Sequence, residues 1–150
     1  MPDSPSRFET QLIRRFPHPV ARVYRAWTMV EHIEQWFCPS DDVHLEVEQF
    51  ELREGGEFRF LYTWPEGVFP VHCKFLTITP EQALIFSWEP QAPHQDAGKE
   101  TMVSVFFRAL APSLTEVEIR HTLFPDDAMR VCHHEGWCGT LDRLSRLLDR

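Results

Sequence analysis

The C-terminal stretch Pro125–Arg150 constrains the fold most, because it predicts one long amphipathic helix. Asp126 and Asp127 follow the proline, where the free N–H groups and the dipole of a helix favour negative charge. At 100° per residue one face of the helix falls within an arc of roughly 120°. This stripe consists of Met129, His133, Trp137, Thr140, Leu141, Leu144, Leu147 and Leu148. Such a stripe needs a concave surface to receive it, which the rest of the chain must supply.

Most of the chain before this helix has the period-two alternation of β-strands. Alternating runs joined by turn sequences cover residues 8–16, 43–52, 58–64, 71–78, 83–89, 101–110 and 115–121, with a bulge expected near Gln49–Phe50. Two short helices are predicted after the first strand, at Pro19–Thr28 and Val30–Phe37. Strands joined by short turns must be antiparallel. The pattern therefore predicts an α+β fold, a curved antiparallel sheet of six to seven strands wrapped round the long C-terminal helix.

Length and charge limit the classes of protein to which this chain can belong. Its 150 residues are the usual size of one domain, so we expect a single domain over residues 1–150. The net charge of −8 argues against nucleic-acid binding through a basic surface. The sequence contains neither an apolar run of membrane-spanning length nor a signal peptide, so we expect no membrane association and a cytoplasmic protein.

The four cysteines predict reduced thiols and no metal site. Cys38, Cys73, Cys132 and Cys138 have no C-x-x-C spacing, and nothing in the sequence indicates secretion. Cys132 and Cys138, with His133 and His134 nearby, resemble a zinc-binding cluster. Their positions lie about 120° apart around a helix, however, so the two thiols do not share a face. We expect no cofactor.

Several segments carry a likeness to a known family. These are VYRAWT at 23–28, EH at 31–32, WF at 36–37, LREGGEFRF at 52–60, IFSWE at 85–89, and the stretch 121–148 with its EGW and LDRL pieces. In these segments the chain resembles the bacterial single-domain homologues of the activator of heat-shock protein 90 ATPase, within the START-like (SRPBCC) superfamily. Two departures fall where a cavity would be lined: Cys132 in place of a glycine, and Phe37–Cys38 in place of a tryptophan and a glycine. Ligand identity is therefore not carried over.

The resemblance implies a helix-grip fold with a cavity between the sheet and the long helix, which usually holds a small apolar or aromatic molecule. Candidate ligand-binding residues are the large or polar side chains expected on the inner faces: Trp27, Trp36, Phe58, Phe60, Cys73, Trp88, Phe107, His121, His133 and Trp137. The tryptophans form either an aromatic cage or core filler. His121 and His133 either orient a ligand and move a proton, or are structural histidines with hydrogen-bond partners in the protein.

The sequence offers no catalytic motif. Glu135 and Asp142 lie off the apolar stripe, Glu135 as a surface charge and Asp142 in reach of Arg146 at i+4. Cys73 faces an apolar wall, which favours an inert thiol. Three functions remain open: a non-catalytic carrier or sensor of a small hydrophobic molecule, a chaperone partner, and a cyclase or hydrolase of the superfamily. Both a monomer and a homodimer are compatible with the sequence.

Overall fold

The computed structural model describes residues 8–150, which form one seven-stranded antiparallel sheet and three helices. The strands are β1 (Thr10–Phe16), β2 (His44–Phe50), β3 (Glu57–Trp64), β4 (Gly67–Thr79), β5 (Ala83–Pro90), β6 (Thr101–Ala111) and β7 (Leu114–Thr122). The helices are α1 (Val20–Thr28), α2 (Val30–Trp36) and α3 (Asp127–Leu148). Within residues 8–150, no helix is long and apolar enough to cross a membrane. The predicted α+β architecture is confirmed.

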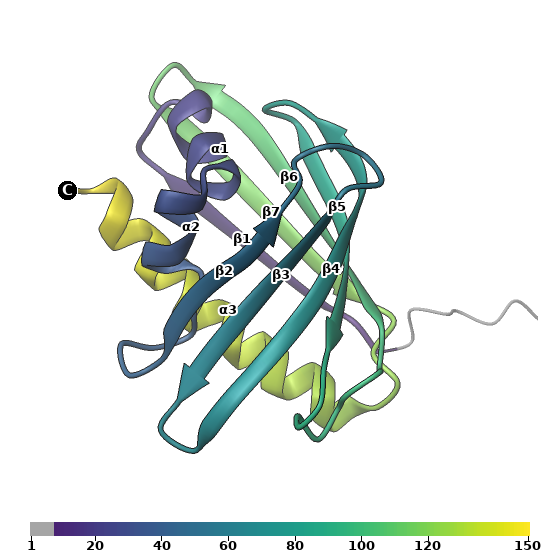
Figure 1. Cartoon of the computed structure of the whole chain (residues 1–150). Helices are drawn as coiled ribbons and strands as arrows, with labels where there is room; N and C mark the ends of the chain where they lie inside the picture. Colours follow the sequence, from purple (N-terminus) through teal and green to yellow (C-terminus); the bar gives the residue numbers. More distant parts are fainter. Residues whose placement is uncertain (1–7) are drawn as a thin grey trace, which may run out of the picture.

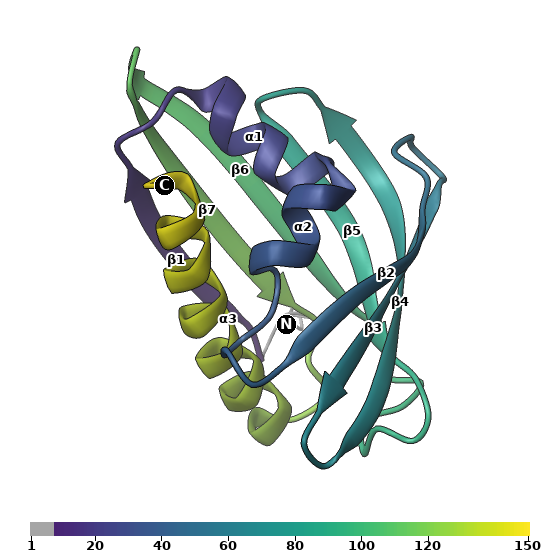
Figure 2. The same ribbon diagram turned by 60° about the vertical axis from the view of Figure 1, so that its left-hand side comes forward.

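The sheet is strongly curved, and all three helices lie on its concave side (Figures 1 and 2). Its strand order is β1-β7-β6-β5-β4-β3-β2. The last strand, β7, therefore pairs with the first strand, β1, which forms one edge of the sheet. Register shifts between Val47 and Gln49, and between Phe75 and Thr77, increase the local twist and help the sheet to curl. The first shift lies beside the predicted bulge.

The inner face of the sheet follows the predicted alternation. On β7, Thr115, Val117, Ile119 and His121 are buried. On β3, Phe58, Phe60 and Tyr62 are buried in the same way. This alternation aims the large side chains of both halves of the sheet at the space beneath the helices.

Helix α3 begins as the sequence predicts. The carboxylate of Asp126 caps it by accepting a hydrogen bond from the backbone N–H of Met129 at 2.8 Å, and Asp127 lies in the first turn. The buried residues of α3 are Met129, Trp137, Thr140, Leu141, Leu144 and Leu148, all of them on the predicted stripe. Only Met129 among them lies in the first ten residues of the helix, so the beginning of α3 packs less tightly than its end.

Helices α1 and α2 meet at Met29, which ends one helix and precedes the other. The indole N–H of the fully buried Trp36 donates to the carbonyl oxygen of Ala26 at 2.8 Å and fixes the angle between the two helices. The loop after α2 is thereby held against α3, where it forms one end of a cavity.

Candidate functional site

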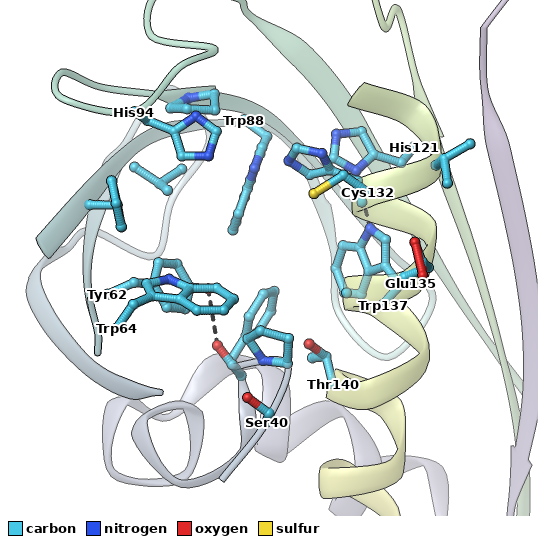
Figure 3. Close-up of a pocket in the computed structure, with 18 of the residues that line it drawn as sticks. Ser40, Tyr62, Trp64, Trp88, His94, His121, Cys132, Glu135, Trp137 and Thr140 are labelled. Atoms are coloured by element: carbon cyan, nitrogen blue, oxygen red, sulfur yellow. Dashed lines mark hydrogen bonds between the residues drawn. The ribbon is translucent and has the colours of Figure 1, made fainter. Parts of the chain in front are cut away.

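A cavity of about 760 Å³ lies between the first half of α3 and the inner face of β3, β4 and β5 (Figure 3). The sheet side of its wall is formed by Tyr62, Trp64, Phe69, Val71, Trp88 and Pro90. The loop between α2 and β2 contributes Phe37, Pro39 and Ser40, and the loop between β5 and β6 contributes His94. The volume falls in the range of small-molecule sites.

Aromatic rings form a large part of the cavity wall and support one another. Phe37 contacts Trp137 in an edge-to-face arrangement at 5.5 Å between ring centroids, and it stacks on Trp88 at 6.1 Å. Tyr62 packs against Trp88 at 6.4 Å and donates its hydroxyl hydrogen to the carbonyl oxygen of Phe37 at 3.0 Å. Burial raises the pKa of Tyr62 well above its usual value, so it remains a neutral phenol. Such a wall suits a flat apolar molecule.

His121 belongs to the lining, although its side chain is fully buried, and it has partners for both ring nitrogens. The indole N–H of Trp137 can only donate, so Nδ1 of His121 accepts its hydrogen bond at 3.1 Å. The proton of the neutral ring is therefore on Nε2, which donates to Oγ1 of Thr101 at 2.7 Å. The Thr101 hydroxyl in turn donates to the carbonyl oxygen of Trp88 at 2.9 Å. His121 thus positions Trp137 and connects β7, β6 and β5.

This network keeps His121 neutral. Burial, followed by the nearby His133, holds the pKa of His121 well below its usual value of 6.5. A second proton would also place an Nδ1–H donor against the donor of Trp137. His121 is therefore unsuited to acid–base chemistry near neutral pH, which favours the structural one of the two alternatives for this residue.

His133 also lines the cavity but has a free ring nitrogen. Its Nδ1 lies 2.9 Å from the carbonyl oxygen of Met129, which can only accept, so Nδ1 carries the proton. Nε2 is then an acceptor with no hydrogen-bond partner among residues 8–150. The ring packs against His121 at 5.2 Å and Phe124 at 5.3 Å between centroids. Burial lowers the pKa of His133 from 6.5, so the ring is neutral at physiological pH.

The loop between β5 and β6 holds His94 at the cavity. Nδ1 of His94 accepts a hydrogen bond from the backbone N–H of Asp96 at 2.9 Å, and its ring meets Phe69 edge-to-face at 5.6 Å. Lys99 bridges Asp96 at 2.9 Å and Asp126 at 3.7 Å, which connects the loop to the start of α3. The loop is therefore fixed to both sides of the cavity entrance.

The lining is nearly free of charge. Within the described part of the chain it includes no Lys or Arg, and Glu135 is its one carboxylate. Glu135 is exposed, as predicted, and lies at the cavity mouth together with the exposed Ala128, Val131 and Cys132. The cavity thus combines an apolar wall with a few neutral polar groups, which is typical of a binding site for an uncharged molecule.

Four of the predicted site residues line this cavity: Trp88, His121, His133 and Trp137. The structure places the other six in the packed interior beside it: Trp27, Trp36, Phe58, Phe60, Cys73 and Phe107. Trp27, Phe58 and Phe60 border a separate void of only about 10 Å³, too small for a ligand. Phe107 packs edge-to-face on Tyr24 and Trp27, where α1 covers the sheet.

Among the described residues, the thiols and carboxylates are not arranged as a reactive or metal-binding group. Burial raises the pKa of Cys73 well above its usual value, so the thiol remains protonated. Over residues 8–150, no set of three or more His, Cys, Asp or Glu side chains is arranged to hold a metal ion. The expected pairing of Asp142 with Arg146 is wrong: Asp142 faces β1 and bonds Arg14 at 2.6 Å, while Arg146 reaches Asp41.

Sequence reasoning missed other lining residues, among them Phe37, Ser40, Tyr62, Trp64, His94 and Thr140. Tyr62 and Trp64 had a usable signal, because they continue the alternation of Phe58 and Phe60 along β3. Phe37, Ser40 and His94 lie in loops after the end of a helix or strand. Their place depends on how these loops fold over the cavity, which no local pattern records.

A curved antiparallel sheet gripping a long C-terminal helix, with a cavity between them, defines a helix-grip protein of the START-like class. The sequence model of one family, described as "Activator of Hsp90 ATPase homolog 1-like protein", matches residues 17–149. The chain therefore belongs to this family, as its sequence motifs indicated.

Solved structures of bacterial proteins share the fold. A protein from Chromobacterium violaceum has a TM-score of 0.84 at 19% identity, over 95% of this chain and 98% of that one. The AHSA1 protein from Silicibacter pomeroyi has a TM-score of 0.81 at 22% identity, over 94% and 97%. A protein from Nitrosomonas europaea has a TM-score of 0.74 at 26% identity, over 98% and 96%. No curated protein sequence matches the chain.

Proposed function

We propose that this protein binds a small apolar or aromatic molecule in the cavity between α3 and the sheet and does not transform it, acting as a cytoplasmic carrier or sensor. The observation that carries the proposal is the cavity itself, about 760 Å³ enclosed largely by aromatic and aliphatic side chains. A space of this size lined by apolar groups loses packing contacts when empty, and an apolar ligand restores them.

The chemistry of the lining favours binding over catalysis. An acid–base mechanism needs a group that exchanges protons near neutral pH within reach of the ligand. His121 uses both ring nitrogens within the protein, and burial lowers the pKa of both His121 and His133. The exposed Cys132 at the mouth has a raised pKa, chiefly because of partial burial of its thiol, and so forms little thiolate.

The proposal is tested by screening small aromatic and lipid-like compounds for thermal stabilisation and for altered tryptophan fluorescence. A ligand at about 100 times its Kd stabilises a domain of this size by about 2.7 kcal/mol, or about 5–10 °C in Tm. Trp88 and Trp137 line the cavity, so the same ligand alters their emission.

Gly136 offers a matched pair of variants. It lies on the cavity side of α3, and a Cβ at this position meets no atom within 4 Å. Gly136→Phe is expected to fill the entrance and weaken binding at least about tenfold without loss of stability, because Phe exceeds Gly in helix propensity. Gly136→Ala is expected to retain binding. Equal affinity of both variants for every hit would place the ligand elsewhere and contradict the proposal.

The family description supports a second candidate, a chaperone partner that changes an ATPase rate. Such an activity requires surface residues rather than the cavity. If Gly136→Phe left stimulation of a chaperone ATPase unchanged while abolishing ligand binding, the two functions would be separate. Stimulation without any ligand across a broad library would favour the chaperone function alone.

A further inference from the structure

We propose that the cavity selects an electrically neutral ligand that carries a hydroxyl group, and that Nε2 of His133 accepts the hydrogen bond from this hydroxyl. The inference deepens the proposed binding function and rests on it. It concerns which class of apolar molecule the cavity prefers: a phenol or other hydroxylated aromatic, in preference to a carboxylate or a molecule without a donor.

The acceptor on His133 follows from its hydrogen bond inside the helix. Because Nδ1 donates to the carbonyl oxygen of Met129, the lone pair of the neutral ring lies on Nε2. Nε2 has no partner among residues 8–150, although the ring is packed between His121 and Phe124. The side chain of His133 is only partly buried, so Nε2 is accessible to water in the empty cavity. A ligand that displaces this water leaves the acceptor unpaired, at a cost in free energy, unless the ligand supplies a donor of its own.

Trp88 supplies the complementary free group on the sheet side. Its side chain is buried and lines the cavity, and its indole N–H has no hydrogen-bond partner. The rings of Trp88 and His133 both contact the ring of His121, at centroid distances of 6.4 and 5.2 Å. An unused donor and an unused acceptor thus both belong to rings that contact the imidazole of His121. Figure 3 shows Trp88 and His121 at the same end of the cavity. A hydroxyl group supplies the donor that Nε2 of His133 lacks.

The charges around the cavity disfavour an anionic ligand. The described lining includes no Lys or Arg to pair with a carboxylate, and Glu135 at the mouth repels one. Nδ1 of His94 is already occupied, because it accepts a hydrogen bond from the backbone N–H of Asp96. A carboxylate that enters the cavity would lose its hydration and find no cation to pair with. It would also offer no hydrogen-bond donor to His133.

Three probes that share one ring system test the inference in the unaltered protein: 2-naphthol, 2-methoxynaphthalene and 2-naphthoate, measured by equilibrium dialysis at pH 7.5. We expect 2-naphthol to bind about threefold to tenfold more tightly than 2-methoxynaphthalene, which retains the oxygen but lacks the donor. We expect 2-naphthoate to bind at least about tenfold more weakly than 2-naphthol.

Two variants of neighbouring residues on α3 assign the preference to His133. His133→Phe retains an aromatic ring but removes the acceptor, so 2-naphthol and 2-methoxynaphthalene should bind it equally. His134→Phe is the control, because His134 does not line the cavity and bonds Thr10 of β1 instead. It should retain the preference of the unaltered protein. A melting curve of each variant establishes that it is folded.

The outcomes separate this inference from the proposed function. Equal binding of all three probes to the unaltered protein would leave the binding function standing and overturn the hydroxyl preference. Tighter binding of 2-naphthoate would overturn it as well. A preference that persists in His133→Phe would remove His133 from the assignment. If none of the three probes bound, while the broader screen also found no ligand, both proposals would fall together.

Discussion

At the scale of single residues, the chain from Trp137 through His121 and Thr101 to Trp88 determines the shape of the cavity wall. Each link has one donor and one acceptor, so the direction of every hydrogen bond follows from Trp137, which can only donate. Because the four residues belong to α3, β7, β6 and β5, the network also connects the helix with the sheet at the cavity. The network requires that the buried imidazole of His121 remain neutral.

We predict that His121 makes the fold sensitive to mild acid. In the unfolded chain its ring binds a proton near the usual pKa of 6.5, whereas burial holds the folded pKa well below that value. As the pH falls below about 6.5 the unfolded state therefore gains a proton that the native state lacks. Stability falls by up to about 1.4 kcal/mol per pH unit, and above that pH the contribution of His121 is constant.

His121→Gln tests this, because the amide keeps one donor and one acceptor but does not titrate. Urea unfolding between pH 5 and pH 8 should give a shallower loss of stability in this variant, with His133 accounting for part of the remaining slope. His44→Gln, a change at an exposed residue, is the control. An unchanged slope in His121→Gln would contradict the prediction.

Single residues also mark where sequence reasoning stops. Trp36 and Trp88 are the same type of residue, and both lie on predicted inner faces. Trp36 nevertheless packs in the core, whereas Trp88 lines the cavity. The alternation of a strand and the stripe of a helix give the direction of a side chain. They do not give the distance to the opposite layer, which decides between core and cavity. That distance depends on sheet curvature and on the position of α3.

At the scale of elements, the close contact between α3 and the loop after α2 sets one end of the cavity. A Cβ at Gly139 would overlap the carbonyl oxygen of Pro39, so only glycine permits this approach. Arg143 adds hydrogen bonds to Asp41 and to the carbonyl oxygen of Gln35. The amphipathic stripe predicted that α3 would be buried on one side. The small residue that allows the loop to approach carries no periodic signal.

Gly139→Ala is therefore expected to destabilise the protein by about 1–3 kcal/mol, because α3 or the Pro39 loop must move to accept the methyl group. Gly136→Ala, one turn earlier, meets no atom within 4 Å and is expected to stabilise by about 0.5–1 kcal/mol through helix propensity. Urea denaturation of both variants measures the difference. Equal effects of the two substitutions would show that the helix and loop do not meet as described.

At the scale of the whole molecule, the interior has two unlike halves. Beneath α1 and α2 the aromatic and aliphatic side chains leave a void of about 10 Å³, whereas the space beside the first half of α3 measures about 760 Å³. The sequence predicts the fold that makes both halves, because the antiparallel strands and the long helix follow from its patterns. It does not predict that the two halves are filled unequally. Phe58 and Tyr62 lie on the same face of β3, yet Phe58 borders the small void and Tyr62 lines the cavity.

Unequal filling predicts unequal local stability. Residues 127–136 of α3 bury only Met129, whereas residues 137–148 bury five side chains, among them Leu141, Leu144 and Leu148. Without a ligand, amides in the first half of α3 should exchange with solvent at least about tenfold faster than those in the second half, after correction for intrinsic rates. A bound ligand should slow exchange mainly in the first half and in the 91–99 loop, because these segments border the cavity. Hydrogen exchange followed by mass spectrometry measures both effects. Uniform protection along α3 without ligand would indicate that the cavity is filled in solution, and the binding proposal would lose its physical basis.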